Sequence, residues 1–247
     1  SRPVRGEVGI LLAPETELYT YAQQGSTDYY ANSMHGAYQG FFDLNVQADF
    51  CRLEHIDEYK LIYLPFPVML KQATADALRA WVEAGGVLVA EGCPGYHGDR
   101  GRVGTTQPNL GLDQLLGARE SYVEFTPDLL GGARGSGTRV RGGLYLQTYE
   151  PTTGTPVGWY DDGRVAAVDH CYGRGKTRLV GTMCGAGYDA HPGDRSPAFF
   201  AEALAYAGIE QHVASSDPRV VARLHDGPGG TSLWVANPTW QPIPVRL

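Results

Sequence analysis

A thiol, an imidazole and two carboxylates lie within nine residues of this sequence. The segment from Glu91 to Asp99 reads Glu-Gly-Cys-Pro-Gly-Tyr-His-Gly-Asp, which makes Glu91, Cys93 and His97 candidate catalytic residues. A cysteine becomes a nucleophile when the pKa of its thiol is lowered and a nearby base can take the proton. Because the segment follows an apolar run, we expect it at the carboxyl end of a buried strand, where open α/β sheets place their ligands.

The pattern around Cys93 departs from that of a working nucleophile turn at two positions. In cysteine hydrolases of the class I amidotransferase type the turn reads Gly-x-Cys-x-Gly, whereas here Gly92 directly precedes Cys93. Pro94 also removes a backbone N–H that an oxyanion hole would use. The residues after Gly98 read as a loop instead of the helix that should follow the nucleophile. We therefore expect a non-catalytic turn, with a hydrolase that uses Cys93 and His97 as the alternative.

Two further motifs are weaker evidence for a functional site, one for phosphate binding and one for metal binding. Residues 173–177 contain the Gly-Lys-Thr of a phosphate-binding loop but lack its first glycine, so a hairpin turn between two strands explains them better. His191 lies close to Asp189 and Asp194, but this spacing matches no known set of metal ligands. We expect neither a metal ion nor an organic cofactor.

A carbohydrate site is the third possibility. Glycoside hydrolysis requires two carboxylates about 5 to 10 Å apart, and no spacing among the glutamates selects such a pair. The chain contains 15 tyrosines and 4 tryptophans, whose rings combine an apolar face with a polar edge. Tyr96 and Trp159 are the candidates for exposed platforms of a carbohydrate-binding module.

Alternating strands and helices must position these residues. Apolar runs predict strands at 7–12, 50–53, 61–64, 87–90 and 178–181. Apolar periodicity and caps predict helices at 28–43, from a Thr74 cap to Gly85, and at 197–207. This alternation indicates a three-layer, doubly wound α/β fold of the flavodoxin-like and amidotransferase-like kind, with a mostly parallel sheet. Antiparallel additions are expected within residues 121–182, where short strand-like runs alternate with turns.

A domain boundary is predicted near residue 213. Residues 1–213 are expected to form the α/β domain, and residues 214–247 a partial C-terminal β domain with strands at 220–224, 232–235 and 245–247. Two or three strands are marginal by themselves. We therefore expect the chain to be a piece of a larger protein.

Charge and cysteine content exclude several classes of partner. The 20 lysines and arginines are outnumbered by 27 aspartates and glutamates, for a net charge of −7. Binding to a nucleic-acid backbone needs clustered basic residues, so we expect no nucleic-acid partner. No apolar stretch is long enough to span a membrane. The four scattered cysteines contain no Cys-x-x-Cys pair, which predicts reduced thiols and a cytoplasmic location.

Three segments together resemble the central trimerisation domain of family 42 β-galactosidases. They are residues 75–90, 172–182 and the tail 220–245. The resemblance implies an amidotransferase-like domain without a nucleophile, followed by the start of a small β domain, within a glycoside hydrolase of carbohydrate metabolism. It further implies self-association, for example as a trimer, and an N-terminal (β/α)₈ barrel that carries the catalytic carboxylates. Those carboxylates have no counterparts in this chain.

Overall fold

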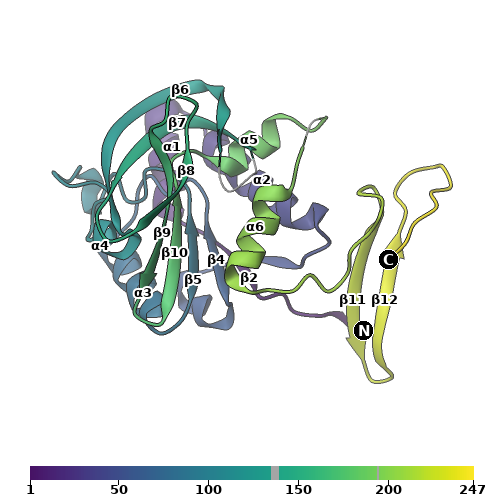
Figure 1. Ribbon diagram of the computed structural model, residues 1–247. Coiled ribbons are helices and arrows are strands. Elements are labelled where there is room, and N and C mark those ends of the chain that lie inside the picture. The colour runs from purple at the N-terminus through teal and green to yellow at the C-terminus, as the bar shows by residue number, and fades with distance from the viewer. Residues whose placement is uncertain (135–138, 194) are drawn as a thin grey trace.

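The centre of the molecule is a mixed sheet with helices on both faces (Figure 1). The computed structural model describes residues 1–134, 139–193 and 195–247. In order across the sheet, the strands are β3 (Ala48–Cys51), β2 (Val8–Leu11), β4 (Leu61–Leu64), β5 (Val87–Ala90), β10 (Gly175–Val180), β9 (Val165–Tyr172), β8 (Thr155–Trp159), β6 (Ala118–Arg134) and β7 (Arg139–Pro151). The first five strands are parallel, and each later pairing is antiparallel. The predicted α/β class, with a parallel sheet and antiparallel additions, is confirmed at this level.

The two faces of the parallel strands carry separate apolar cores. Leu61 and Tyr63 of β4 face one core, whereas Ile62 and Leu64 face the other, because successive side chains of a strand point to opposite faces. The first core is covered by α2 (Asp28–Asp43), α5 (Cys184–Ala190) and α6 (Ala198–Ala207). The second is covered by α3 (Gln72–Glu83), α4 (Leu112–Leu116) and the 3₁₀ helix η1 (Leu53–Glu58).

Several predicted boundaries are correct and others need correction. The helix at 28–43 and the strands at 61–64 and 87–90 are confirmed, whereas the strand expected at 50–53 is β3, two residues earlier. Helix α3 begins after Lys71, so Thr74 is not its N-cap. The sequence reading also missed α1 (Pro14–Gln24), η2 (Asp99–Gly101), α4 and α5. Helix α1 buries only two threonines and α5 is rich in glycine, so neither has the apolar periodicity that reveals a helix.

The antiparallel part of the sheet reaches over the carboxyl end of the parallel part. Strands β6 and β7 are 17 and 13 residues long, far longer than the short runs expected from the sequence. In the middle of β7, the Gln147 N–H donates to the carbonyl oxygen of Gly181, just after β10, at 2.7 Å. A Cβ atom on Gly142 would lie 1.9 Å from the Thr182 hydroxyl. The β6–β7 ribbon therefore covers the edge at which the predicted site lies.

Both ends of the chain lie at a small second sheet (Figure 1). Its strand order is β1 (Arg2–Pro3), β11 (Val221–Gly227) and β12 (Gly230–Ala236). The third strand expected at 245–247 is wrong, because β1 occupies the free edge of β11 instead. Arg223 joins this sheet to α2, since its guanidinium donates to the Asn45 side chain at 3.0 Å and lies over the Phe42 ring.

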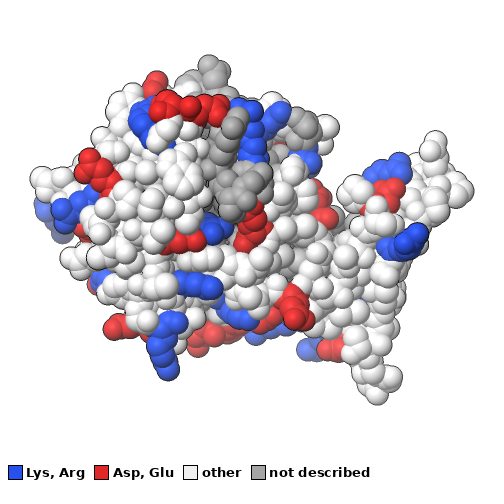
Figure 2. All heavy atoms as spheres, viewed as in Figure 1, with Lys and Arg blue, Asp and Glu red and all other residues white. Residues whose placement is uncertain are grey.

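Charged side chains are mixed on the face shown in Figure 2, and the small sheet at its right is largely uncharged. None of the helices in the described ranges has the length and apolar character to cross a bilayer.

Two glycines allow α2 and α5 to touch through their backbones. A Cβ atom on Gly36 would lie 1.9 Å from the Gly185 carbonyl oxygen, and one on Gly185 would lie 2.2 Å from the Ser33 carbonyl oxygen. Neither backbone oxygen can move aside as a flexible side chain could. This contact fixes the position of the α5 N-terminus beside the sheet.

Substitution of Gly36 by alanine therefore tests the contact between α2 and α5, because the sign of the change in the free energy of unfolding depends on whether the contact exists. In an unobstructed helix, glycine to alanine stabilises by about 1 kcal/mol, but here the clash should reduce the free energy of unfolding by about 1 to 3 kcal/mol. Urea unfolding measures the difference. Asn32→Ala, at an exposed position of the same helix, is the matched control and should not destabilise. Stabilisation by Gly36→Ala would contradict the close packing.

Candidate functional site

The turn after β5 has the backbone conformation of a strained elbow. Cys93 has φ of 58°, a left-handed conformation that costs a non-glycine residue energy and persists only where its surroundings enforce it. The Gly95 N–H donates to the Pro67 carbonyl oxygen at 2.7 Å, and the His97 N–H to that of Val68 at 2.9 Å. The structure thus places Glu91, Cys93 and His97 at one edge of the sheet, as predicted from their position after a buried strand.

The thiol and the imidazole in this turn lie in different environments. Cys93 is 1% exposed, and burial raises the pKa of its thiol well above the ordinary value. Both ring nitrogens of His97 are engaged elsewhere, one with the Tyr19 hydroxyl at 2.7 Å and the other with the Gly101 carbonyl oxygen at 3.3 Å. A reactive cysteine needs the opposite environment, in which nearby positive charge and solvent access favour the thiolate.

The amide of the elbow is also already occupied. The Cys93 N–H donates to Oε1 of Gln147, a fully buried side chain of β7, at 2.7 Å. Pro94 has no N–H to offer. An oxyanion hole needs donors aimed at an open position, whereas here the donor binds the protein's own side chain. Sequence reasoning missed Gln147, because a polar residue in an alternating strand reads as a solvent-facing position.

Glu91 is a fully buried carboxylate at the end of β5. Its Oε1 accepts hydrogen bonds from the Tyr63 hydroxyl at 2.7 Å and from the Gly185 N–H of α5 at 2.6 Å. Its Oε2 accepts from the Phe66 N–H at 2.9 Å, where Phe66 is left-handed with φ of 43°. Burial raises the pKa of Glu91 to about 7, and the hydrogen bonds partly oppose that shift. Glu91 therefore connects β4, β5 and α5.

Aromatic rings surround the mouth of the turn. We call Tyr19, Tyr29, Tyr96, Phe125 and Tyr145 the edge cluster. Tyr29 and Tyr145 contact Phe125 with ring centroids 6.1 and 5.3 Å apart, and Tyr19 packs on His97 at 4.4 Å. Phe125 is 49% exposed, so the cluster reaches the surface. Of the two predicted sugar platforms, Tyr96 belongs to this cluster, whereas Trp159 lies at the end of β8.

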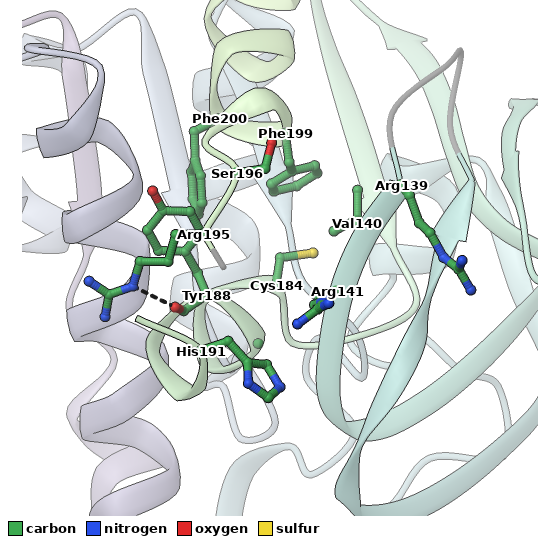
Figure 3. Close-up of a pocket in the computed structure, with 11 residues that line it drawn as sticks. Arg139, Val140, Arg141, Cys184, Tyr188, His191, Arg195, Ser196, Phe199 and Phe200 are labelled. Atoms are coloured by element: carbon green, nitrogen blue, oxygen red, sulfur yellow. Dashed lines mark hydrogen bonds between the residues drawn. The ribbon is translucent and has the colours of Figure 1, made fainter. Parts of the chain in front are cut away.

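A pocket of about 210 Å³ opens between β7, α5 and α6 (Figure 3). Its walls include the Cys184 thiol, the Tyr188 and Phe199 rings and three arginines. The guanidinium groups of Arg139 and Arg195 point away from each other in Figure 3. Arg195 donates to the Tyr188 carbonyl oxygen at 2.9 Å, and Arg139 pairs with Asp161 on the exposed surface. The guanidinium groups of Arg139 and Arg195 therefore do not converge on one ligand position.

The other sequence motifs have structural roles. Gly173 forms the turn between β9 and β10, so the hairpin interpretation of residues 173–177 is confirmed. The N-terminus of α3, which could attract an anion, already faces two protein carboxylates, those of Glu15 and Asp99. Within the described part of the chain, no cluster of three or more His, Cys, Asp or Glu side chains could hold a metal ion. Asp194, suggested beside His191, lies outside the described residues.

The titration of Glu91 should be visible in the stability of the protein. Its carboxyl has a pKa near 4.3 when unfolded and about 7 when folded. Its contribution to the free energy of unfolding is therefore fully present below about pH 4.3 and is lost as the pH rises through about 7. In Glu91→Gln this pH dependence disappears. As the pH rises, the variant should therefore gain stability relative to the wild type, by roughly 1.4 kcal/mol per unit of difference between the folded and unfolded pKa.

Chemical unfolding between about pH 4.5 and 8 measures this difference. Glu83→Gln, which removes an exposed carboxylate from α3, is the matched control for loss of a negative charge. A stability difference between Glu91→Gln and wild type that stays constant with pH would show that the buried carboxyl does not titrate in this range.

Comparison with solved structures supports the fold. A family 42 β-galactosidase from G. stearothermophilus aligns with a TM-score of 0.80 and 18% identity over 95% of this chain and 35% of that enzyme. The β-galactosidase from Bacillus circulans sp. alkalophilus aligns with a TM-score of 0.77 and 16% identity over 94% of this chain and 35% of that enzyme. The β-galactosidase from the Antarctic haloarchaeon Halorubrum lacusprofundi aligns with a TM-score of 0.74 and 20% identity over 96% of this chain and 35% of that enzyme. The chain thus spans about a third of the length of these enzymes.

No curated protein sequence matches the chain significantly. The profile of one protein family, described as the β-galactosidase trimerisation domain, matches residues 7–210, which include the whole nine-stranded sheet and the helices that cover it. On this match over most of its length, the chain belongs to the β-galactosidase trimerisation domain family.

Proposed function

We propose that this chain is a self-association domain of a larger glycoside hydrolase and performs no catalysis itself. The edge cluster is the observation that carries the proposal. Phe125 exposes 49% of its surface and contacts Tyr29 and Tyr145 of the cluster. Large aromatic side chains that are exposed in the free protein are typical of the centre of a protein interface, where their burial contributes strongly to binding. A second copy of the chain is the partner that the family description supports.

The parent protein in this proposal is a β-galactosidase-like enzyme. The three solved enzymes compared above are described as β-galactosidases and are about three times as long as the aligned region. We infer that an N-terminal (β/α)₈ barrel of the parent supplies the catalytic carboxylates and binds the galactoside. Trimeric assembly, carbohydrate metabolism and a cytoplasmic location are parts of the same proposal. The location accords with the free thiols of the four cysteines, all of which lie within the described residues.

The finer description of the fold is also proposed. In chain order the five parallel strands are arranged 2-1-3-4-5, the order of flavodoxin-like folds. Together with the left-handed Cys93 after the fourth of these strands, this order supports an amidotransferase-like origin. We retain residues 1–213 and 214–247 as the two domains. The pairing of Arg2 and Pro3 with β11 adds the start of the chain to the smaller sheet.

A cysteine-dependent hydrolase is the less supported alternative. It needs an activated thiol, but burial raises the pKa of the Cys93 thiol, and Gln147 occupies the elbow amide. The carbohydrate-binding alternative rests on Tyr96 and Trp159, which lie on separate elements.

Replacement of Phe125 by serine should weaken self-association. If this ring lies at the centre of the interface, the dissociation constant should rise at least about 10-fold, equivalent to about 1.4 kcal/mol. Size-exclusion chromatography with light scattering over a dilution series provides the measurement. Trp240→Ser is the matched control, because Trp240 is a fully exposed aromatic residue beyond β12. A wild-type chain that stays monomeric at all concentrations would overturn the proposal, as would equal dissociation constants for Phe125→Ser and wild type.

A further inference from the structure

The side-chain amide of Gln147 is surrounded by three polar groups, the Cys93 N–H, the Tyr149 hydroxyl and the Glu120 carboxylate, which we call the cradle. Its Oε1 accepts two hydrogen bonds, from the Cys93 N–H at 2.7 Å and from the Tyr149 hydroxyl at 2.6 Å. Its Nε2 donates to Oε2 of Glu120 at 2.6 Å. Gln147 and Tyr149 are buried, and Glu120 is half-buried at the outer side. Two donors thus face the oxygen of the amide, and one carboxylate faces its nitrogen.

This arrangement selects one functional group. A carboxylate in the same place would bring negative charge against Glu120, and like charges at this distance repel strongly when partly buried. A dialkylated amide would keep the oxygen contacts but would have no N–H for Glu120. Leaving buried polar groups without partners is costly, so the cradle favours a primary carboxamide over both.

The groups of the cradle are also positioned by contacts that do not involve the Gln147 side chain, such as the Gly95 N–H to Pro67 carbonyl hydrogen bond in the turn. They come from the turn after β5, from β6 and from β7. The backbone of Gln147 is anchored separately, because its N–H donates at 2.7 Å to the Gly181 carbonyl oxygen, which also accepts from the Tyr160 hydroxyl at 2.8 Å. Truncation of the side chain should therefore leave β7 in place and leave a vacant space lined by Cys93, Tyr149 and Glu120.

We propose that Cys93, Glu120 and Tyr149 form a binding site for a primary carboxamide, which the protein fills from within with the side chain of Gln147. A small carboxamide from solution can take this position when the glutamine is shortened to alanine. The atoms removed by Gln147→Ala correspond to acetamide, which makes acetamide the probe. The ligand reaches the site from the side of Glu120, the one cradle group that is not fully buried.

Thermal unfolding of Gln147→Ala with increasing acetamide tests the site. The variant should unfold at a lower temperature than wild type, and acetamide should raise its midpoint in a saturable way, because a ligand that binds the folded state stabilises it by mass action. Acetate and N,N-dimethylacetamide should not do so. The wild-type midpoint should show no saturable rise, since its cradle is full.

Gln107→Ala is the matched control. Gln107 is a half-buried glutamine whose amide nitrogen donates to backbone carbonyls, and its Oε1 has no hydrogen-bond donor among the described residues. Acetamide should not rescue this variant. Equal effects of acetamide on Gln147→Ala and Gln107→Ala, or equal rescue by acetate, would overturn the proposal.

Gln147→Glu keeps the test decisive if the alanine variant does not fold. The new carboxylate would face Glu120, and two adjacent carboxylates retain a shared proton to a raised pKa. Stability from that proton is present at low pH and is lost as the pH rises. The midpoint of Gln147→Glu should therefore fall relative to wild type between about pH 5 and pH 8. A difference that does not depend on pH would contradict the proposed contact with Glu120.

Discussion

The structure depends on how buried polar groups are satisfied at the carboxyl ends of the parallel strands. Helices and strands pair most of their own backbone groups, but at this edge the strands end and the chain turns. Three backbone N–H groups, of Phe66, Cys93 and Gly185, find side-chain acceptors there in Glu91 and Gln147. An unpaired buried group of this kind costs about 1 to 3 kcal/mol. These two side chains therefore hold β4, β5, α5 and the β6–β7 ribbon in one arrangement.

The same arrangement explains why a strained turn can persist without catalytic use. A left-handed cysteine is costly unless its surroundings determine it, and here the turn is fixed by backbone hydrogen bonds and by Gln147. In an active site such a conformation would present the thiol to a substrate. In this protein the β6–β7 ribbon crosses the edge, buries the thiol and raises its pKa. The backbone geometry of a nucleophile is thus separated from the electrostatics that a nucleophile requires.

Closure of the edge also shapes the outer surface. Phe66, held in its left-handed conformation by Glu91, packs against Tyr29 and Tyr145, and both of these contact the exposed Phe125. Rigid aromatic side chains lose little conformational entropy when they bind, which makes such a surface suitable for assembly. The buried Glu91 therefore helps to fix the position of the aromatic rings in the proposed interface, through Phe66. In this fold, the ligand position of an open α/β sheet is filled by protein, and the surface above it is available for association.

By itself, the sequence determined the parallel core and the position of the Cys93 turn directly after a buried strand. Strands such as 61–64 and 87–90 are continuous apolar runs, and helix 28–43 has clear periodicity, so local patterns are enough to identify them. The missing glycine spacing and Pro94 were sufficient to argue against a nucleophile. Only the tertiary structure revealed α1 and α5, the pairing of β1 with β11 and the role of Gln147. Each of these depends on contacts between residues far apart in the chain. A single polar residue in a strand gives no local sign that its amide will be buried against a turn more than fifty residues away.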